Sequence, residues 1–454
     1  MWYKAQEWRH LIGERRVLIA GYGREGRSSE ALLSQLLPQH QFAVADGTEN
    51  ILHLAPDYDL ILKSPGIPTM VFEDVCDLSK ISSQTDLFLQ IYAPQSIGIT
   101  GTKGKSTTTK LIYDILQCHL STQDCSCLKD YSVKDTECFC DGRVSETCCF
   151  SEVMKAGNMG IPLFDIVPRL TPQTLVVAEL SCHQLENIHR APHISVLLNL
   201  FQEHLDHYHD YDDYKNAKLN IFRYQQSGDI GFYCSDNKEL SMAVKDMSAE
   251  VRSQLVSYDV SHGFDVDVSP SLQGKHNRSN LTVAAAVAHR LGVSDDTISQ
   301  TAKSFKGLPY RMEYVGCFRG IHFYDDSIST IPEAAMAAVN AIPNVDTLIL
   351  GGFDRGIDYG ELVAFLTSSS IRNLVFVGAA GRRMLDLYRQ ILPADSDSRN
   401  IIQTDDYAAI VPWCYSHTAQ GKVCLLSPAA SSYDAFKNFE ERGCLFNKLV
   451  SQYQ

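Results

Sequence analysis

The chain has 454 residues and a mass of 50.6 kDa, a length that predicts about three domains. Apolar residues make up 44% of it and charged residues 21%, which excludes a disordered, collagen-like or wholly coiled-coil protein. Forty lysines and arginines against 54 acidic residues give a net charge of −14, which argues against nucleic-acid binding. Anions can still bind in local pockets of backbone amides and a few cations.

The sequence favours a cytoplasmic protein without a membrane anchor. No apolar run approaches the roughly 20 residues that a bilayer requires, and the N-terminal residues lack the apolar core of a signal peptide. Fourteen cysteines in a long chain without an export signal indicate reduced thiols.

The first chemical motif is a glycine-rich turn, Gly21-Tyr-Gly23-Arg-Glu-Gly26, between an expected strand and an expected helix. The next two expected strands lead to Asp46 and to Ser64. This order is typical of a Rossmann-like half, which binds a nucleotide at the turn. A tight turn that binds nothing is the alternative. The three strands are expected at Arg16–Gly21, Gln41–Ala45 and Asp59–Leu62.

The clearest motif is Gly101-Thr-Lys-Gly104-Lys105-Ser106-Thr107, which follows an expected strand at Ser96–Thr100 and precedes an expected helix. Backbone amides and a helix N-terminus can hold phosphate oxygens there. Lys105 would reach the β- and γ-phosphates, and Ser106 would bind Mg²⁺. Ile99 stands where the full P-loop pattern has glycine. The motif predicts an ATP site, and a purely structural glycine turn is the alternative.

Acidic and histidine side chains follow two later strands. Glu179 ends one strand, at a place where a nucleotide site commonly holds its metal ion, and a solvated glutamate is the alternative. His204, His207 and His209 follow the other. Their spacing does not place all three on one helical face, which favours a single functional histidine over a zinc site.

Lys218 lies in an expected helix at Tyr214–Phe222 and has apolar neighbours. A partly desolvated lysine can be neutral enough to react, whereas a surface lysine would extend its amine into water. The residues alone favour the surface lysine.

Strands alternate with helices along the chain, which predicts an α/β protein of three domains. We expect a Rossmann-like domain at 1–94, a P-loop domain with a mainly parallel sheet at 95–309, and a second Rossmann-like domain at 310–454. Later strands are expected at Thr174–Ala178, Ile194–Leu198, Ile230–Tyr233, His322–Tyr324, Thr347–Leu350, Asn373–Val377 and Val423–Leu426. Helices are expected at Thr108–Gln117, Asn280–Leu291, Pro332–Ala341, Tyr359–Leu366, Arg382–Gln390 and Asp434–Leu449.

Eight motifs follow one another along the chain. They are the P-loop, Gly157-Asn158-Met-Gly160, Glu179-Leu-Ser with Gln184-Leu-Glu186, Glu203-His204-Leu-Asp206 with Lys218, Gly274–Asn280, Gly307-Leu-Pro-Tyr-Arg311, Asp326-Ser327 and Leu426–Gly443. In content and order they resemble the Mur ligases of peptidoglycan precursor synthesis, over nearly the whole chain. The last block is the most specific for the member of that family that adds D-glutamate.

This resemblance implies an ATP-dependent ligation of D-glutamate to UDP-N-acetylmuramoyl-L-alanine, through an acyl phosphate and with two Mg²⁺ ions. The implied ATP contacts are Gly101, Thr102, Lys103, Gly104, Lys105, Ser106, Thr107, Asn280, Arg311 and Asp326. The implied metal ligands are Ser106, Glu179, His204 and a carbamate on Lys218. Lys105, Glu179, His204 and Lys218 would be the catalytic residues.

The resemblance also implies where the other substrates bind. Gly21, Gly23, Gly26, Asp46 and Ser64 would hold the UDP part of the substrate, and Asn158 its muramoyl part. Thr330, Arg355, Ser432 and Phe439 would surround D-glutamate. Lys103 stands where many relatives have asparagine, and Ile328 and Arg355 stand where others have lysines. Because a guanidinium can form two parallel hydrogen bonds with a carboxylate, we expect Arg355 to bind a carboxylate group in this way. A monomer is expected.

Three other functions are weighed against this one. Another ligase of the same superfamily, adding a different amino acid or acting on folate, is disfavoured by the Ser427–Phe439 block. A P-loop kinase or ATPase would not explain the Lys218 stretch or the Arg311 motif. A non-enzymatic dinucleotide-binding regulator would not need the intact P-loop.

A cysteine-rich segment at about 119–146 lies outside the resemblance. Its pairs Cys125-Ser-Cys127 and Cys138-Phe-Cys140 have the spacing C-x-C, whereas zinc ribbons use C-x₂-C. A structural disulfide set does not suit a reducing cytoplasm. We therefore expect a surface loop or hairpin inserted in the central domain, without stoichiometric zinc.

Overall fold

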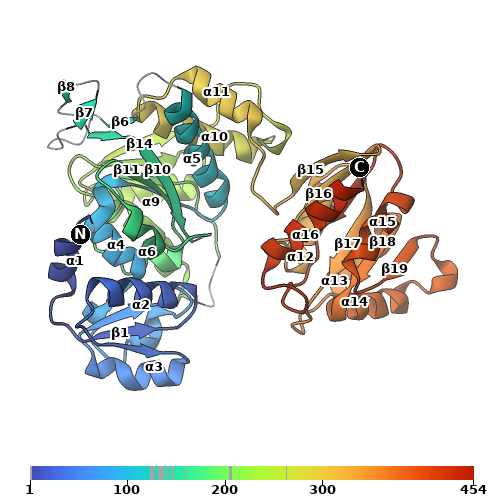
Figure 1. Cartoon of the computed structure of the whole chain (residues 1–454), viewed down its shortest axis with the longest axis horizontal. Helices are drawn as coiled ribbons and strands as arrows, with labels where there is room; N and C mark the ends of the chain where they lie inside the picture. The colour runs from blue at the N-terminus through green and yellow to red at the C-terminus, as the bar shows by residue number, and fades with distance from the viewer. Residues whose placement is uncertain are drawn as a thin grey trace. The chain divides into compact units, whose positions relative to one another are not determined.

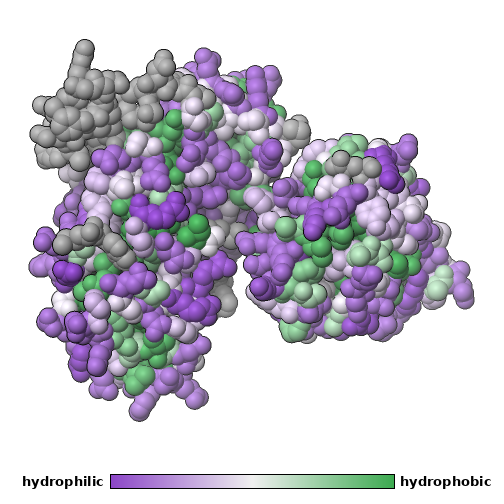
Figure 2. Space-filling view, in the orientation of Figure 1, coloured by the Kyte–Doolittle hydropathy of each residue, from purple (hydrophilic) through white to green (hydrophobic). Residues whose placement is uncertain are grey.

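The structure is a computed structural model that describes residues 3–122, 128–130, 138–140, 143–145, 148–158, 160–203, 207–261, 263–272 and 274–453. It divides into two compact units, Met1–Phe305 and Lys306–Gln454. The first unit holds two large parallel sheets and two two-stranded antiparallel ones, and the second unit holds one mixed sheet (Figure 1). The α/β fold class is confirmed. Figure 2 shows hydrophilic side chains over much of the visible face of each unit.

The first sheet has the strand order β2-β1-β3-β4, and all its pairs are parallel. Because β2 and β3 lie on opposite sides of β1, the first two crossovers run in opposite directions, as in doubly wound folds. The strands are β1 (Val17–Ala20), β2 (Phe42–Ala45), β3 (Leu60–Lys63) and β4 (Ile81–Ser82). The helices of this part are α1 (Ala5–Ile12), α2 (Arg24–Leu36), α3 (Thr48–Leu54) and α4 (Gln84–Tyr92).

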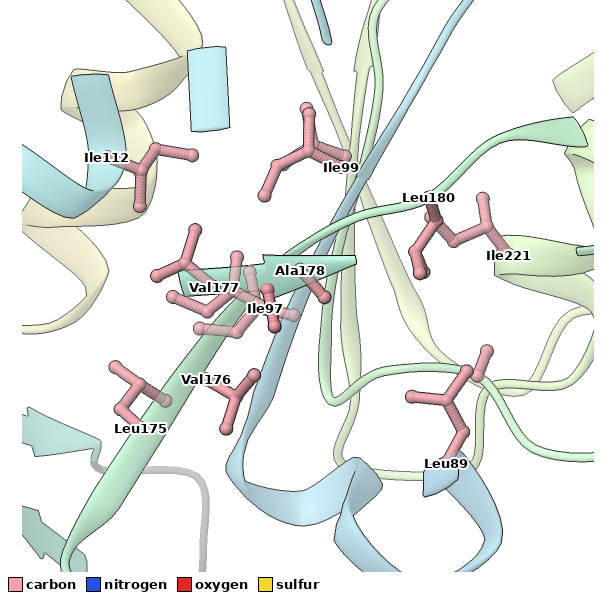
Figure 3. Close-up of a cluster of buried hydrophobic side chains, with 14 of the residues drawn as sticks. Leu89, Ile97, Ile99, Ile112, Leu175, Val176, Val177, Ala178, Leu180 and Ile221 are labelled. Atoms are coloured by element: carbon pink, nitrogen blue, oxygen red, sulfur yellow. The ribbon is translucent and has the colours of Figure 1, made fainter. Parts of the chain in front are cut away.

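The central sheet has the order β10-β11-β5-β12-β13-β14 and is parallel throughout. Its strands are β5 (Ser96–Thr100), β10 (Glu152–Gly157), β11 (Thr174–Glu179), β12 (Ile194–Leu197), β13 (Ile230–Cys234) and β14 (Gln254–Tyr258). Every residue of β5 is buried, because the strand lies inside the sheet with helices on both faces. Figure 3 shows Ile97 and Ile99 of β5 on the same side of the sheet as Val177 and Ile112.

The helices of the central part are α5 (Lys105–Thr122), α6 (Leu163–Ile166), α7 (Cys182–Leu185), α8 (Tyr211–Arg223), α9 (Lys238–Met247), α10 (Lys275–Arg290) and α11 (Asp295–Ser304). The expected strands and helices of this part are found, with β10 and β14 added at the two edges of the sheet. Only short pieces of the cysteine-rich segment are described: β6 (Leu128–Asp130) pairs antiparallel with β9 (Cys148–Phe150), and β7 (Cys138–Cys140) with β8 (Arg143–Ser145). The rest of that segment, and the expectation about zinc, lie outside the described residues.

The sheet of the second unit has the order β15-β16-β20-β17-β18-β19, in which only the β15–β16 pair is antiparallel. Its strands are β15 (Glu313–Phe318), β16 (Ile321–Asp325), β17 (Val345–Gly351), β18 (Asn373–Val377), β19 (Asn400–Gln403) and β20 (Val423–Leu426). Alternate residues of a strand enter cores on opposite faces: Leu348 packs with helices α12–α14, and Ile349 packs with α15 and α16.

The helices of this unit are α12 (Pro332–Ala341), α13 (Gly360–Ser368), α14 (Gly378–Ile391), α15 (Tyr407–His417) and α16 (Phe439–Gln452). The expected start of the last helix at Asp434 is wrong. The side chain of Asn438 accepts a hydrogen bond from the Glu441 amide at 2.9 Å and caps the helix, which therefore begins at Phe439. Within the described ranges, no helix is both long and apolar enough to cross a membrane.

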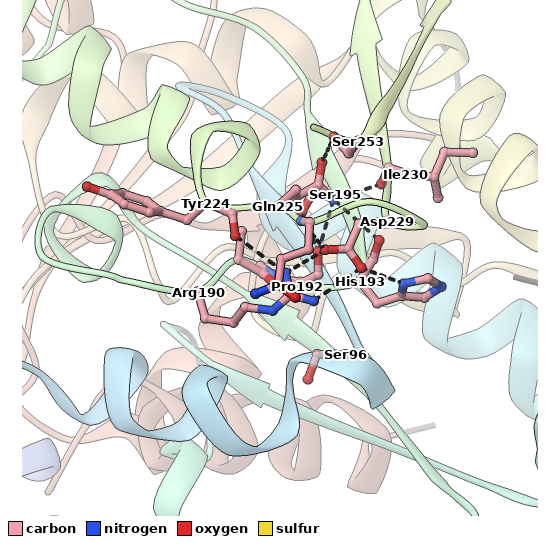
Figure 4. A network of polar contacts seen from close by, with 12 residues as sticks. Ser96, Arg190, Pro192, His193, Ser195, Tyr224, Gln225, Asp229, Ile230 and Ser253 are labelled. Carbon is pink, nitrogen blue, oxygen red and sulfur yellow. Dashed lines mark hydrogen bonds and ion pairs between the residues drawn. The ribbon is translucent and has the colours of Figure 1, made fainter. Parts of the chain in front are cut away.

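A buried polar network fixes the amino-terminal edge of the central sheet (Figure 4). Asp229, which precedes β13, accepts hydrogen bonds from Arg190 and from His193 Nδ1, the latter at 2.8 Å. Gln225 donates to the Pro192, His193 and Ile230 carbonyls. Although burial opposes ionisation, the His193 and Arg190 hydrogen bonds hold the pKa of Asp229 below its usual value.

We expect Asp229→Ala to lower the free energy of unfolding of the first unit by about 3–5 kcal/mol, because it leaves the largely buried Arg190 and the buried His193 without their carboxylate. The lowered pKa means that this contribution is present at neutral pH and is lost as the pH falls through the native pKa. Urea denaturation measures it. Asp265→Ala is the control, because Asp265 is 83% exposed in its pair with Arg278, and its loss should cost at most about 1 kcal/mol. Equal effects of the two variants would contradict the prediction.

Candidate active site

The P-loop connects the end of β5 to the start of α5, so backbone amides gather at the N-terminus of an 18-residue helix. Gly101 and Gly104 have φ values of +151° and +87°. A Cβ at Gly104 would lie 2.6 Å from Asn280 Oδ1, and one at Gly101 would lie 2.9 Å from Leu198 Cβ. Glycine is required at both positions, and Asn280, one of the expected nucleotide contacts, lies directly beside the loop.

The amine of Lys105 is folded over the loop. Its Nζ donates to the carbonyl oxygens of Gly101 at 2.9 Å and Thr102 at 3.0 Å. Burial lowers its pKa, and the nearby carboxylate of Glu179 opposes that shift. The ammonium group therefore lies among the atoms that would surround a phosphate group.

Two residues without a predicted role hold the loop in place. Asn199 accepts from the Lys103 amide at 2.8 Å and donates to the Lys103 carbonyl at 3.0 Å. The hydroxyls of Thr102 and Tyr214 lie 2.8 Å apart. Asn199 lies two residues after the end of β12, and polar residues just beyond strand ends are typical of ligand-binding loops. The exposed amine of Lys103 pairs with Glu203.

Lys218 is only 1% exposed, so the surface-lysine alternative is wrong. Its Nζ donates to the Gly101 carbonyl at 3.0 Å and lies 5.0 Å from the centre of the Tyr214 ring. Burial, together with the charge of Lys105, lowers its pKa to about 7. Two amines thus share the carbonyl oxygen of Gly101, and one of them is partly neutral at neutral pH.

Glu179 ends β11, the strand next to β5, and is buried. Its Oε1 accepts from Asn158 Nδ2 at 3.0 Å, and its carbonyl accepts from the Asn158 amide at 2.8 Å. Gly157 permits this contact, because a Cβ there would lie 2.2 Å from the Glu179 carbonyl oxygen. Glu179 and Asn158, predicted for metal and muramoyl binding, are therefore adjacent.

A carboxylate at the end of a strand beside the P-loop suits Mg²⁺, which prefers oxygen ligands, and Ser106 lies in the first turn of α5. No cluster of three or more His, Cys, Asp or Glu side chains with a metal-binding arrangement occurs among the described residues. His204, the other predicted ligand, lies outside them.

A cavity of about 780 Å³ adjoins the P-loop. Its volume suits a base and ribose, and its wall combines apolar side chains with a few polar ones. The lining residues are Lys103, Gly104, Leu198, Asn199, Phe201, Cys234, Asp236, Asn237, Lys238, Val260, Lys275, His276, Ser279 and Asn280.

The glycine turn after β1 is tightly packed. Gly21 has φ +88°, its carbonyl accepts from the Ser64 hydroxyl at 2.9 Å, and a Cβ at Gly26 would lie 2.1 Å from the Gly21 oxygen. Asp46 Oδ1 accepts from the Tyr22 amide at 3.3 Å and is exposed. The structure thus gives Gly21 and Gly26 a close-packing role in forming the turn.

A second cavity, of about 370 Å³, opens beside this turn. It brings Gly23 and Ser64 together with Asn158, whereas Gly21, Gly26 and Asp46 do not line it. Its wall consists of Gly23, Arg24, Glu25, Ser64, Pro65, Gly66, Gly157, Asn158 and Pro162. Two of the residues predicted to hold UDP, Gly23 and Ser64, therefore share one cavity with Asn158, the predicted muramoyl contact.

Charged side chains without a predicted role join the two sheets near this cavity. Lys63 is buried and donates to Glu186 at 2.9 Å, and Gln184 donates to Glu25 at 2.7 Å. Burial opposes ionisation of Glu186, but the His207 hydrogen bond and the charge of Lys63 lower its pKa to about 2. Burial raises the pKa of Glu25 to about 7. Both Gln184 and Glu186 belong to the motif Gln184-Leu-Glu186, for which the sequence alone predicted no such contact.

In the second unit, the residues predicted to surround D-glutamate follow the ends of three neighbouring strands. Arg355 Nη2 donates to the Thr330 carbonyl at 2.9 Å, so these two are together. Ser432 is buried in the segment after β20, and the Phe439 carbonyl accepts from the Ser327 hydroxyl at 2.8 Å. Carboxyl ends of parallel strands are the usual place for a ligand in such sheets.

The two residues of this unit that were predicted to contact the nucleotide differ in burial. Asp326 is buried, accepts from the Ser427 hydroxyl at 2.7 Å and from the Met312 amide at 3.1 Å, and has a pKa raised by burial. Arg311 is exposed. Asp326 is therefore fixed in position, and the guanidinium of Arg311 is accessible.

Comparison with known proteins agrees with this arrangement. Residues 99–288 match the model of the Mur ligase middle domain. The chain is 28% identical to the UDP-N-acetylmuramoylalanine–D-glutamate ligase of Listeria innocua, with 97% of each chain covered. Two solved structures share the fold. MurF of Acinetobacter baumannii has a TM-score of 0.55, 16% identity and coverage of 82% of this chain and 81% of that one. MurF of Thermotoga maritima in complex with ADP has a TM-score of 0.52, 15% identity and coverage of 96% and 95%.

Three α/β sheets, a P-loop on the central one and the matched middle domain together define the class of protein. Residues 99–288 form a Mur ligase middle domain, and over nearly its full length the chain is similar to UDP-N-acetylmuramoylalanine–D-glutamate ligases.

Proposed function

We propose that this protein ligates D-glutamate to UDP-N-acetylmuramoyl-L-alanine at the expense of ATP. The observation that carries the proposal is the pair of amines, from the half-buried Lys105 and the buried Lys218, on the Gly101 carbonyl of the P-loop. The near full-length similarity to a D-glutamate ligase and the Leu426–Gly443 block support the choice of amino acid.

In the proposed reaction, the free carboxylate of the substrate attacks the γ-phosphorus of ATP, ADP leaves, and an acyl phosphate forms. The amine of D-glutamate then attacks the carboxyl carbon, and phosphate leaves as the amide forms. Phosphoryl transfer depends mainly on positioning and charge neutralisation, which the P-loop amides and Lys105 provide. Asn280, Arg311 and Asp326 are proposed to contact the nucleotide.

The proposed metal ligands are Ser106, Glu179, His204 and a carbamate on Lys218. Bound Mg²⁺ would neutralise charge on the transferring phosphoryl group. Lys218 can take this role because only a neutral amine reacts with CO₂, and the pKa of about 7 leaves much of it neutral.

The proposed substrate site is the 370 Å³ cavity at Gly23, Ser64 and Asn158, shaped by Gly21, Gly26 and Asp46. The incoming D-glutamate is proposed to bind at Thr330, Arg355, Ser432 and Phe439. The proposed setting is the cytoplasm, and the proposed state a monomer.

Phosphate release tests the proposal. Purified protein with ATP and UDP-N-acetylmuramoyl-L-alanine should release phosphate only when D-glutamate is added, and not with L-glutamate, L-lysine or meso-diaminopimelate. Release with a different amino acid would identify another amide ligase. Release without any amino acid would indicate an ATPase, and nucleotide binding without turnover would indicate a regulator.

Arg355→Ala is expected to raise the KM for D-glutamate by about 10²-fold and the KM for ATP by less than about threefold, because a bidentate arginine–carboxylate contact is lost. Steady-state kinetics with each substrate varied in turn measure this. Arg382→Ala is the matched control, since Arg382 is half exposed in a pair with Asp405. An equal rise in both KM values in Arg355→Ala would contradict the assignment.

A further inference from the structure

Arg442, in the first turn of α16, is completely buried. All five of its N–H groups are used. Nε donates to the Ser327 hydroxyl at 2.9 Å, and Nη2 to the carbonyls of Ser327 at 2.8 Å and Ala430 at 3.0 Å. Nη1 donates to the carbonyls of Ser431 at 3.3 Å and Gly351 at 3.5 Å. Because no donor remains, the guanidinium cannot itself bind a substrate.

The acceptors of Arg442 belong to three neighbouring strands. Ser327 follows β16, Ala430 and Ser431 follow β20, and Gly351 is the last residue of β17. β20 lies between the other two, so Arg442 ties together the loops at the carboxyl edge of the sheet, where ligands bind in such folds. Close packing maintains this arrangement, because a Cβ at Gly443 would lie 2.5 Å from Asp325 Oδ2.

The charge of Arg442 is poorly compensated. All its hydrogen bonds end on neutral oxygens, and burial lowers its pKa. Asp434 and Asp325 both interact with it electrostatically, but Asp434 is exposed to solvent. Burial raises the pKa of Asp325 to about 7, so its carboxyl group is only partly ionised at neutral pH. A buried cation without a full counter-charge is costly. An anion at the adjacent edge of the sheet would supply the missing charge.

The hydrogen bonds of Arg442 also reach the segment that carries the proposed D-glutamate residues. Ser431, one of its acceptors, precedes Ser432. The Ser327 hydroxyl accepts from Arg442 Nε and donates to the Phe439 carbonyl at 2.8 Å. The backbone next to both Ser432 and Phe439 is therefore fixed through one guanidinium group.

We propose that Arg442 is a positioning residue for the incoming amino acid, which fixes the loops that carry Ser432 and Phe439 and adds positive potential for the carboxylates of a dicarboxylic amino acid. This role rests on the proposed function. It differs from that of Arg355, whose guanidinium would touch the substrate.

Arg442→Lys tests the proposal, because lysine keeps the charge but cannot bridge three loops. We expect the KM for D-glutamate to rise about tenfold or more, and the KM values for ATP and the UDP substrate to change less than about threefold. Ser327→Ala, which removes one link of the network, should raise the KM for D-glutamate about threefold to tenfold. If Arg442→Lys does not fold, Ser327→Ala decides.

Arg399→Lys is the matched control. Arg399 directly precedes β19, at the opposite edge of the same sheet, and donates to the carbonyls of Leu366, Thr367, Ser369 and Ile371. The Arg399→Lys variant should have a lower thermal stability, as Arg442→Lys should, but its KM for D-glutamate should be unchanged. An unchanged amino-acid KM in Arg442→Lys or Ser327→Ala, or an equal rise in Arg399→Lys, would overturn the proposal. If the wild-type protein ligates another amino acid, the KM values of the same variants are compared for that amino acid. In that case the proposed specificity for D-glutamate fails, and the positioning role of Arg442 is still tested.

Discussion

Lys105→Ala is expected to lower the rate of ligation by about 10²–10³-fold or more and to leave the fold intact. The Lys105 amine lies on the Gly101 and Thr102 carbonyls, at the loop that would hold the phosphates. Removing a charge that stabilises a transferring phosphoryl group typically costs several kcal/mol of activation free energy. The steady-state rate of product formation measures the effect, and circular dichroism checks the fold.

Lys110→Ala is the matched control for this variant. Lys110 lies on the same helix, α5, and pairs with Asp114 at 2.7 Å. This pair spans one helical turn and contributes at most about 0.5 kcal/mol to stability, so the rate should stay near that of the wild type. Near-normal product formation by a well-folded Lys105→Ala protein would reject the P-loop as the ATP site.

The second large effect is expected at Lys218, which we propose to be a carbamate in the active enzyme. A carbamate would turn the buried amine into an anion that can bind a metal ion. Lys218→Ala should therefore reduce ligation about 10²–10³-fold. Added short carboxylates should restore part of the rate, because they can occupy the space of the lost carbamate.

Two measurements separate this role from a structural one. Protein equilibrated with ¹³C-labelled CO₂ should show one carbamate NMR signal that is absent from Lys218→Ala. Lys215→Ala, on the same helix and paired with Asp212, should keep both the signal and the activity. Full activity of Lys218→Ala, or a wild-type protein without a CO₂-dependent signal, would contradict the carbamate.

The P-loop and the strand before it could be predicted because the residues that they require are consecutive in the sequence. A strand buried on both faces must be apolar throughout, and the sharp turn after it needs glycine. The edge strands β10 and β14 were not predicted. Lys155 on β10 and Gln254 on β14 point to solvent, which breaks the apolar run that identified the inner strands.

The surroundings of Lys218 and Arg442 could not be predicted in the same way. The Lys218 amine contacts Gly101, and Arg442 contacts Ser327, each more than 100 residues away in the chain. Local sequence does not encode such contacts, so a lysine with apolar neighbours on a helix indicates a surface residue as readily as a buried one. The order of motifs indicated the role of Lys218, and only the fold shows its burial.

The central claim is that ATP activates the substrate carboxylate before the amine attacks. It is tested most directly with UDP-N-acetylmuramoyl-L-alanine that carries ¹⁸O in its free carboxylate. With ATP and D-glutamate, mass spectrometry should find one ¹⁸O in each phosphate released and one glutamate added to each product molecule. This is because a carboxylate oxygen leaves with the phosphate when the acyl phosphate reacts. Ligation that releases phosphate without ¹⁸O would contradict the acyl phosphate, and the absence of D-glutamate ligation would contradict the proposed activity.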